Sequence, residues 1–210
     1  MNRVNKQDYI CTAKKSPNNC KSKTGSLDKS SLKFLVDKYM DEYRDCYKQE
    51  DQWWGDKTLS WEKAIETAWK SRFANGKMHP HQYRVGEKKL DKGLQVCLRH
   101  NRKCDSFNDF HDIYCWIESI CKNTDGIGSL TTYDIARRLG AWLGKQPEIV
   151  YLHAGSMKGA KKLGIKGETV SLNDFPPEIQ ELGATHAENF LCIYKERLSV
   201  VISDSYVNRC

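Results

Sequence analysis

The segment Asp125–Thr131, with the sequence Asp-Gly-Ile-Gly-Ser-Leu-Thr, constrains the fold of this chain more than any other. On both sides of it apolar residues recur at intervals of three and four, which predicts an amphipathic helix before it and another after it. The two glycines, one residue apart, allow the chain to end the first helix and reverse tightly into the second. Backbone N–H groups at the start of the second helix then face outward, where a phosphate can bind.

The same spacing predicts helices along most of the chain. From about Asp28 an apolar face begins with Leu32 and Leu35, and a later stripe places Trp61 and Trp69 in a core. A weaker helical stretch over 80–98 is interrupted by two glycines, a short apolar run over 149–152 is extended, and a capping box at Thr185 opens the final helix. We therefore expect an all-α fold of about eight short helices over 27–210.

Charge is distributed unevenly along the chain. The net charge is +7, and residues 1–26 contain six basic residues against one aspartate. This polar segment, with its Pro-Asn-Asn and Thr-Gly-Ser stretches, predicts a basic N-terminal arm. A basic arm favours a polyanionic partner such as nucleic acid, although a solubilising tail has the same composition.

The nine cysteines do not form a recognisable framework. They are odd in number, irregularly spaced and without a CxxC pair, and the N-terminus lacks the apolar segment of an export signal. We expect reduced thiols, a cytoplasmic location and no membrane span. The segment His79-Pro80-His81 offers two histidines, but without a third ligand in the sequence it is more typical of a protein surface, so neither a metal site nor a cofactor is expected.

A family resemblance follows from these residues. Residues 106–143, with the turn Gly126-Ile127-Gly128, resemble a helix-hairpin-helix DNA-binding motif. In this chain Thr124 replaces a residue that is usually apolar, and Thr132 replaces a residue that is usually alanine. Over about residues 106–198 the order of elements resembles the helix-hairpin-helix DNA glycosylases. The resemblance implies a monomer that binds double-stranded DNA, flips a damaged or modified base and hydrolyses its N-glycosyl bond.

The catalytic positions of that family are altered in this chain. Counting from Gly128 to the family's catalytic aspartate leads to Glu148, and aligning the apolar run leads to Ala154 or Gly155. The lysine of the bifunctional members is Leu130 here, so a β-lyase is not expected. The candidate catalytic carboxylates are therefore Glu148 and Asp134. Each carboxylate also has a purely structural interpretation. Glu148 can stabilise the start of a helix through the helix dipole, and Asp134 can form an ion pair with an arginine of its own helix.

Further residues complete the expected site. Tyr151 and His153 alternate along the apolar run and share one face of an extended backbone, so they are candidates for a base pocket or for ordinary core packing. The residues expected to contact DNA are Gly126, Ile127, Gly128, Ser129, Thr131, Lys158 and Lys161. Two other hypotheses stay open: a non-catalytic DNA-binding module, and an all-α interaction protein in which the glycines only form a turn.

Overall fold

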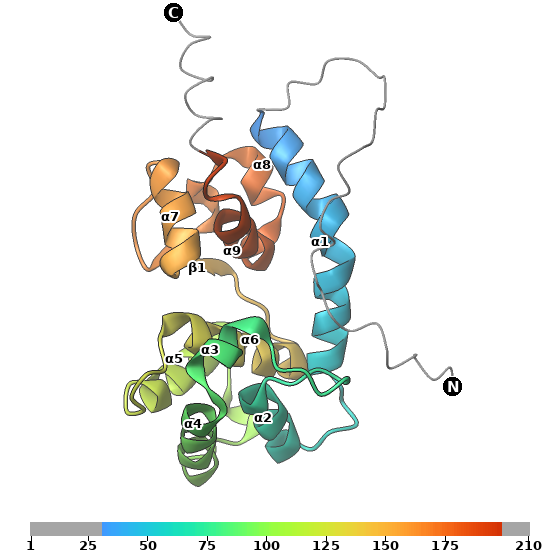
Figure 1. Cartoon of the computed structure of the whole chain (residues 1–210), viewed down its shortest axis with the longest axis vertical. Coiled ribbons are helices and arrows are strands. Elements are labelled where there is room, and N and C mark those ends of the chain that lie inside the picture. Colours follow the sequence, from blue (N-terminus) through green and yellow to red (C-terminus); the bar gives the residue numbers. More distant parts are fainter. Residues whose placement is uncertain (1–30, 199–210) are drawn as a thin grey trace, which may run out of the picture. The chain divides into compact units, whose positions relative to one another are not determined.

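The computed structural model describes residues 31–198, and this part of the chain is mostly helical (Figure 1). Its helices are α1 Leu32–Trp54, α2 Trp61–Lys70, α3 Pro80–Val85, α4 Glu87–Arg99, α5 Phe110–Cys121, α6 Ser129–Leu143, α7 Ala154–Lys162, α8 Pro177–Gln180 and α9 Gly183–Tyr194. The expected helical character is confirmed, and the all-α expectation is corrected by the short strands β1 Ile149–Tyr151 and β2 Thr169–Ser171. The basic arm at 1–26 lies outside the described residues.

The chain divides into two compact units, which are described separately. The hairpin unit comprises Tyr47–Pro147, and the C-terminal unit comprises the described residues 31–46 and 148–198. Helix α1 contributes residues to both units. None of the helices in the described part of the chain combines the length and the apolar character needed to cross a membrane.

The hairpin unit is built from α2 to α6 and the end of α1. Helices α5 and α6 pack against each other, α2 packs against α4 and α6, and α4 also contacts α5. The apolar stripes of these helices meet in a core of Trp61, Ile65, Trp69, Leu90, Leu94, Ile113, Ile117, Ile135 and Leu139. The predicted core positions of Trp61 and Trp69 are therefore confirmed.

The two glycines of the weak helical stretch have different roles. Gly86 has a φ of +90° and separates α3 from α4, so the predicted interruption occurs there. Gly93 instead lies inside α4, where a Cβ atom would be only 2.2 Å from Cζ3 of Trp69. A glycine is needed at this position of the helix because the buried indole ring occupies the space that a side chain would need.

The C-terminal unit packs helices around a small sheet. Strands β1 and β2 pair antiparallel with Val150 opposite Val170, and α9 packs against α7, α8 and β1. Tyr39 of α1 is buried in this core, and its hydroxyl group lies 2.9 Å from Nδ1 of His186. The expected start of the last helix at Thr185 is wrong, because α9 begins two residues earlier at Gly183.

The expectation of reduced thiols is confirmed for part of the described chain. Cys97, Cys104, Cys115, Cys121 and Cys192 are free thiols, but the expectation is wrong for Cys46, which is disulfide-bonded. Burial raises the pKa of Cys97 to about 12, which suppresses its thiolate form at neutral pH. Buried thiols in the hairpin unit therefore behave as small apolar side chains.

Candidate functional site

The turn between α5 and α6 has the tight reversal that the glycines predict. Thr124 is buried, its hydroxyl donates to the Ile120 carbonyl at 3.1 Å, and its backbone N–H donates to the Cys121 carbonyl at 2.9 Å. Thr124 therefore satisfies the end of α5 through hydrogen bonds, at a position where the family resemblance places an apolar side chain. Gly126 follows with a φ of +80°, a conformation that favours glycine.

Gly128 differs from Gly126 in what its backbone requires. Its φ is −98°, which any residue can adopt, and a Cβ atom added there would meet nothing within 4 Å. It is the residue that precedes the first turn of α6, and no side chain caps this helix. The first turn therefore presents backbone N–H groups that have no partner within the helix. Packing inside the described protein does not explain a glycine at this exposed position.

Lys89 adds a positive charge to the turn. This exposed residue of α4 extends its side chain over Gly126, so that a Cβ atom there would be 2.5 Å from the ammonium nitrogen. The ammonium group of Lys89 and the N-terminal end of the α6 dipole are both positive, so together they attract an anion to this turn. This contact could not be predicted from the sequence, because Lys89 is 37 residues before Gly126.

A buried polar cluster lies further along α6. The Gln82 side-chain amide donates to Oδ2 of Asp134 at 2.6 Å, and Nδ1 of His81 lies 3.2 Å from the same oxygen. The Asp134 side chain is 16% exposed. Burial alone would raise the pKa of Asp134, but the hydrogen bond with His81 and the positive charge of Arg138 outweigh it and hold this pKa below its ordinary value. Asp134 is thus a carboxylate at neutral pH.

The two arginines of α6 do not form the expected pair with Asp134. Arg137 donates to Oδ1 of Asp51 at 2.7 Å. Arg138 is buried and donates to the Ser71 hydroxyl at 2.6 Å, to the Gln82 side-chain oxygen at 2.7 Å and to a carbonyl of α2. The intrahelical pairing of Asp134 is therefore wrong, because the hydrogen-bond partners of all three side chains come from other segments.

A cavity of about 20 Å³ lies beside this cluster. It is lined by Glu50, Asp51, Trp54, His79, Asp134, Arg137 and Arg138. Burial lowers the pKa of His79 to about 3 and raises the pKa of Glu50. A space of this size accommodates about one water molecule or one ion, and it has no room for a nucleobase.

The remaining predicted residues lie in the C-terminal unit. Glu148 is exposed just before β1. Tyr151 in β1 is 2% exposed, and His153, which precedes α7, is 3% exposed, so both contribute to the core of this unit. Lys158 and Lys161 are exposed on α7. The predicted residues are thus divided between the two units, and Asp134 and Glu148 are not in the same one.

The predicted residues of the turn also differ in exposure. Gly126, Gly128 and Ser129 are exposed, Ile127 is partly buried, and Thr131 is buried. The Ile127 N–H donates to the Thr124 carbonyl at 3.3 Å, so it is directed into the turn. Thr131 therefore offers little surface to a phosphate.

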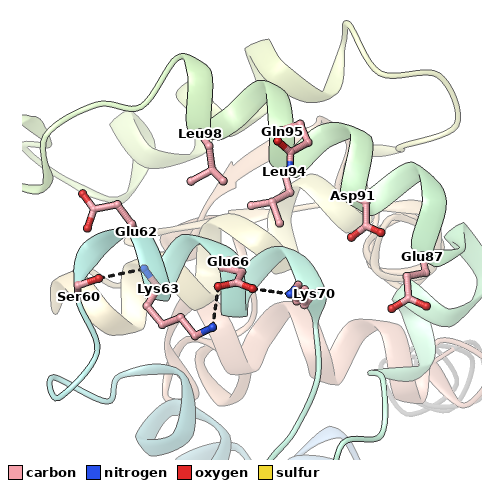
Figure 2. Close-up of a pocket in the computed structure, with 10 residues that line it drawn as sticks. All are labelled: Ser60, Glu62, Lys63, Glu66, Lys70, Glu87, Asp91, Leu94, Gln95 and Leu98. Atoms are coloured by element: carbon pink, nitrogen blue, oxygen red, sulfur yellow. Dashed lines mark hydrogen bonds and ion pairs between the residues drawn. The ribbon is translucent and has the colours of Figure 1, made fainter.

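A groove between α2 and α4 is unsuited to nucleic acid. Figure 2 shows it lined by four carboxylates, from Glu62, Glu66, Glu87 and Asp91, and by two ammonium groups. Both lysines, Lys63 and Lys70, contact Glu66 through their ammonium groups (Figure 2). An acidic groove repels phosphate.

Comparison of the chain with protein-family models, with curated proteins and with solved structures finds no match.

Proposed function

We propose that the protein binds double-stranded DNA through the α5–α6 turn, which contacts backbone phosphates. The observation that carries this proposal is Gly128. It is a glycine that neither its φ nor its neighbours require, at an uncapped helix start. Glycine at such a position allows another molecule to approach the backbone closely.

The charges around the turn support the same function. Lys89 lies over Gly126, and the first turn of α6 adds the positive end of a helix dipole. Such contacts position a duplex without selecting its sequence, because they involve phosphates and not base edges. We therefore expect binding that depends on salt concentration and little on base sequence.

The substitution Gly128→Asp tests this proposal. Aspartate is a favourable residue before the first turn of a helix, so the variant is expected to be as stable as the wild type or up to about 1 kcal/mol more stable. The same carboxylate repels a phosphate and occupies its N–H groups, which is expected to weaken DNA binding about tenfold. Fluorescence anisotropy with a labelled duplex measures the affinity, and urea unfolding measures the stability.

The control is Gln95→Glu, which makes the same charge change in the α2–α4 groove. It is expected to leave the affinity within about twofold of the wild type, because it is not at the phosphate contact. Unchanged binding by Gly128→Asp would refute the proposal. An equal loss in both variants would reduce it to a nonspecific effect of net charge.

Base excision is a second candidate function, and Asp134 is the residue that favours it. This carboxylate is held ionised on α6, six residues after Gly128 and hence about 9 Å further along the helix axis. An ionised carboxylate can stabilise the positive charge that develops on a sugar as its glycosidic bond breaks. The base would need a space other than the 20 Å³ cavity.

The excision test uses duplexes that carry different modified bases, followed by alkaline cleavage at abasic sites. The expected result is cleavage of at least one duplex by the wild type and none by Asp134→Asn, with DNA binding retained by both. Binding of every duplex without any abasic site would leave the DNA-binding module as the function.

A further inference from the structure

Three metal-ligating side chains meet where α3 begins against α6. His79, His81 and Asp134 each offer one ligand atom, and these atoms all lie within 4.8 Å of one another. The two histidines flank Pro80, the first residue of α3, and the rings have centroids 5.0 Å apart. Asp134 is 53 residues after His81, so the fold supplies the third ligand that the His-Pro-His segment lacks in the sequence.

The distances are close to those of a metal site. Bonds of about 2.1 Å in tetrahedral geometry place neighbouring ligand atoms about 3.4 Å apart. Nδ1 of His81 and Oδ2 of Asp134 are already 3.2 Å apart. The pairs that involve His79 lie within 4.8 Å, so the remaining adjustment is on the order of 1 Å, which side-chain rotation can provide.

The surroundings of the cluster also resemble those of ligating residues. The buried Gln82 orients Asp134 with a 2.6 Å hydrogen bond, as outer residues orient the carboxylates that bind metals. The guanidinium of Arg138 donates to Ser71, to Gln82 and to a carbonyl of α2, and these three hydrogen bonds do not use an oxygen of Asp134. The carboxylate is therefore held in position by Gln82, and Arg138 acts on it through its charge and not through a direct hydrogen bond.

A small cavity adjoins two of the three ligands. His79 and Asp134 line the 20 Å³ cavity, which is large enough for one ion or one water molecule. Glu50 and Asp51 line the same cavity, where their carboxyl groups balance the charges of Arg137 and Arg138. Two imidazoles and a carboxylate leave one position of a tetrahedral ion for water, the arrangement found in zinc sites with an exchangeable ligand.

We infer that His79, His81 and Asp134 form a binding site for a divalent transition-metal ion of the zinc class. Imidazole nitrogens combined with a single carboxylate favour Zn²⁺ and its neighbours Co²⁺ and Ni²⁺ over Mg²⁺ and Ca²⁺, which prefer oxygen ligands. The inference is independent of DNA binding, because it concerns different residues and is measured without nucleic acid.

The experiment measures Zn²⁺ binding by the full-length protein after removal of metal with a chelator. Titration calorimetry is expected to give one site per chain, and Zn²⁺ is expected to raise the midpoint of thermal unfolding. Asp134→Asn and His81→Gln are each expected to weaken binding at least about 100-fold and to abolish the thermal shift. The emission of the tryptophans in the hairpin unit shows whether each variant remains folded.

The matched controls are His100→Gln and His111→Gln, which remove exposed histidines of the same unit. His111 is informative because its Nε2 lies 3.4 Å from the Cys115 sulfur, so the pair can bind zinc adventitiously. Both controls are expected to bind Zn²⁺ like the wild type, and the Co²⁺ complex is expected to lack a thiolate absorption band. Three results would overturn the inference: no binding by the wild type, unchanged binding by folded His81→Gln, or loss of binding in His111→Gln.

Discussion

Arg138 is the residue whose replacement tests the organisation of the hairpin unit most directly. Its side chain is 5% exposed and lies over the Trp54 ring, with the guanidinium carbon 4.7 Å from the ring centroid. It donates to Ser71 and Gln82 at 2.6 and 2.7 Å, and its charge lies close to Asp134. The substitution Arg138→Met keeps most of the side-chain volume but removes the charge and every donor.

The expected loss of stability follows from these contacts. A hydrogen bond from a charged group contributes about 1.5–3 kcal/mol, and a buried acceptor left without its donor carries a further penalty. Ser71 keeps the hydrogen bonds that its hydroxyl donates to the carbonyls of Ala68 and Trp69, whereas the buried Gln82 side-chain oxygen is left without its donor and Asp134 loses a neighbouring positive charge. Removal of one member of a buried charged network costs about 3–5 kcal/mol, and this is the decrease in the free energy of unfolding that we expect.

The assay is urea unfolding followed by tryptophan emission. All six tryptophans of the chain, Trp53, Trp54, Trp61, Trp69, Trp116 and Trp142, belong to the hairpin unit, so their signal reports on that unit. With an m-value of about 2 kcal/mol/M, the midpoint is expected to fall by about 2 M urea. A chelator in all samples keeps metal binding from contributing to the difference.

Two comparisons make the result interpretable. Arg138→Lys keeps a charge but lacks the planar fork of donors. We therefore expect its free energy of unfolding to lie between that of the wild type and that of Arg138→Met. Arg84→Met changes an exposed residue of α3 and is expected to alter stability by no more than about 0.5 kcal/mol. A loss below about 1 kcal/mol for Arg138→Met, or an equal loss for Arg84→Met, would contradict the assignment of Arg138 as a buried structural charge.

Three further predictions concern the two cores and the thiols. Gly93→Ala is expected to destabilise the hairpin unit by about 1–3 kcal/mol in urea unfolding, because the new methyl group overlaps the Trp69 ring; wild-type stability would contradict this. Gly159→Ala places a Cβ atom 2.4 Å from a carbonyl oxygen of α9 and is expected to lower the thermal midpoint measured by circular dichroism, whereas an unchanged midpoint would mean that α7 shifts without cost. At pH 8 an aromatic disulfide reagent is expected to modify the exposed Cys115 rapidly and Cys97 only after unfolding, since burial and a pKa of about 12 protect Cys97; equal rates in the folded protein would refute this.

The sequence predicts the local features of the hairpin unit well. Apolar spacing identifies α5 and α6, and the predicted tight turn lies between them, with Gly126 at a positive φ. Both predictions depend on residues that are close in the sequence, where the helical period and the needs of a tight turn act directly. The continuous path of α4 through Gly93 was not predictable in this way. The reason for a glycine at this position is the Trp69 ring, which comes from another helix.

The polar cluster could not be predicted from spacing for the same reason. Asp134 and Arg138 are four residues apart on α6, and this spacing favours a pair between them. In the folded chain Asp134 instead contacts His81 and Gln82, while Arg138 contacts Ser71 and Gln82. Tertiary hydrogen bonds replace the local pair because a buried charge needs more partners than one neighbour on its own helix can provide.

Asp134 also connects the proposals, because its carboxylate cannot serve two of them at once. As a zinc ligand it directs its negative charge to the ion, so little remains to stabilise a positive sugar. If excision depends on a free Asp134, zinc that occupies the site must inhibit it, and the chelated protein must be the active form. If the site is structural or binds a reactive water, the chelated protein gains no excision activity and DNA binding through Gly128 continues without the metal. The relation between zinc occupancy and excision therefore decides which role α6 assigns to its carboxylate.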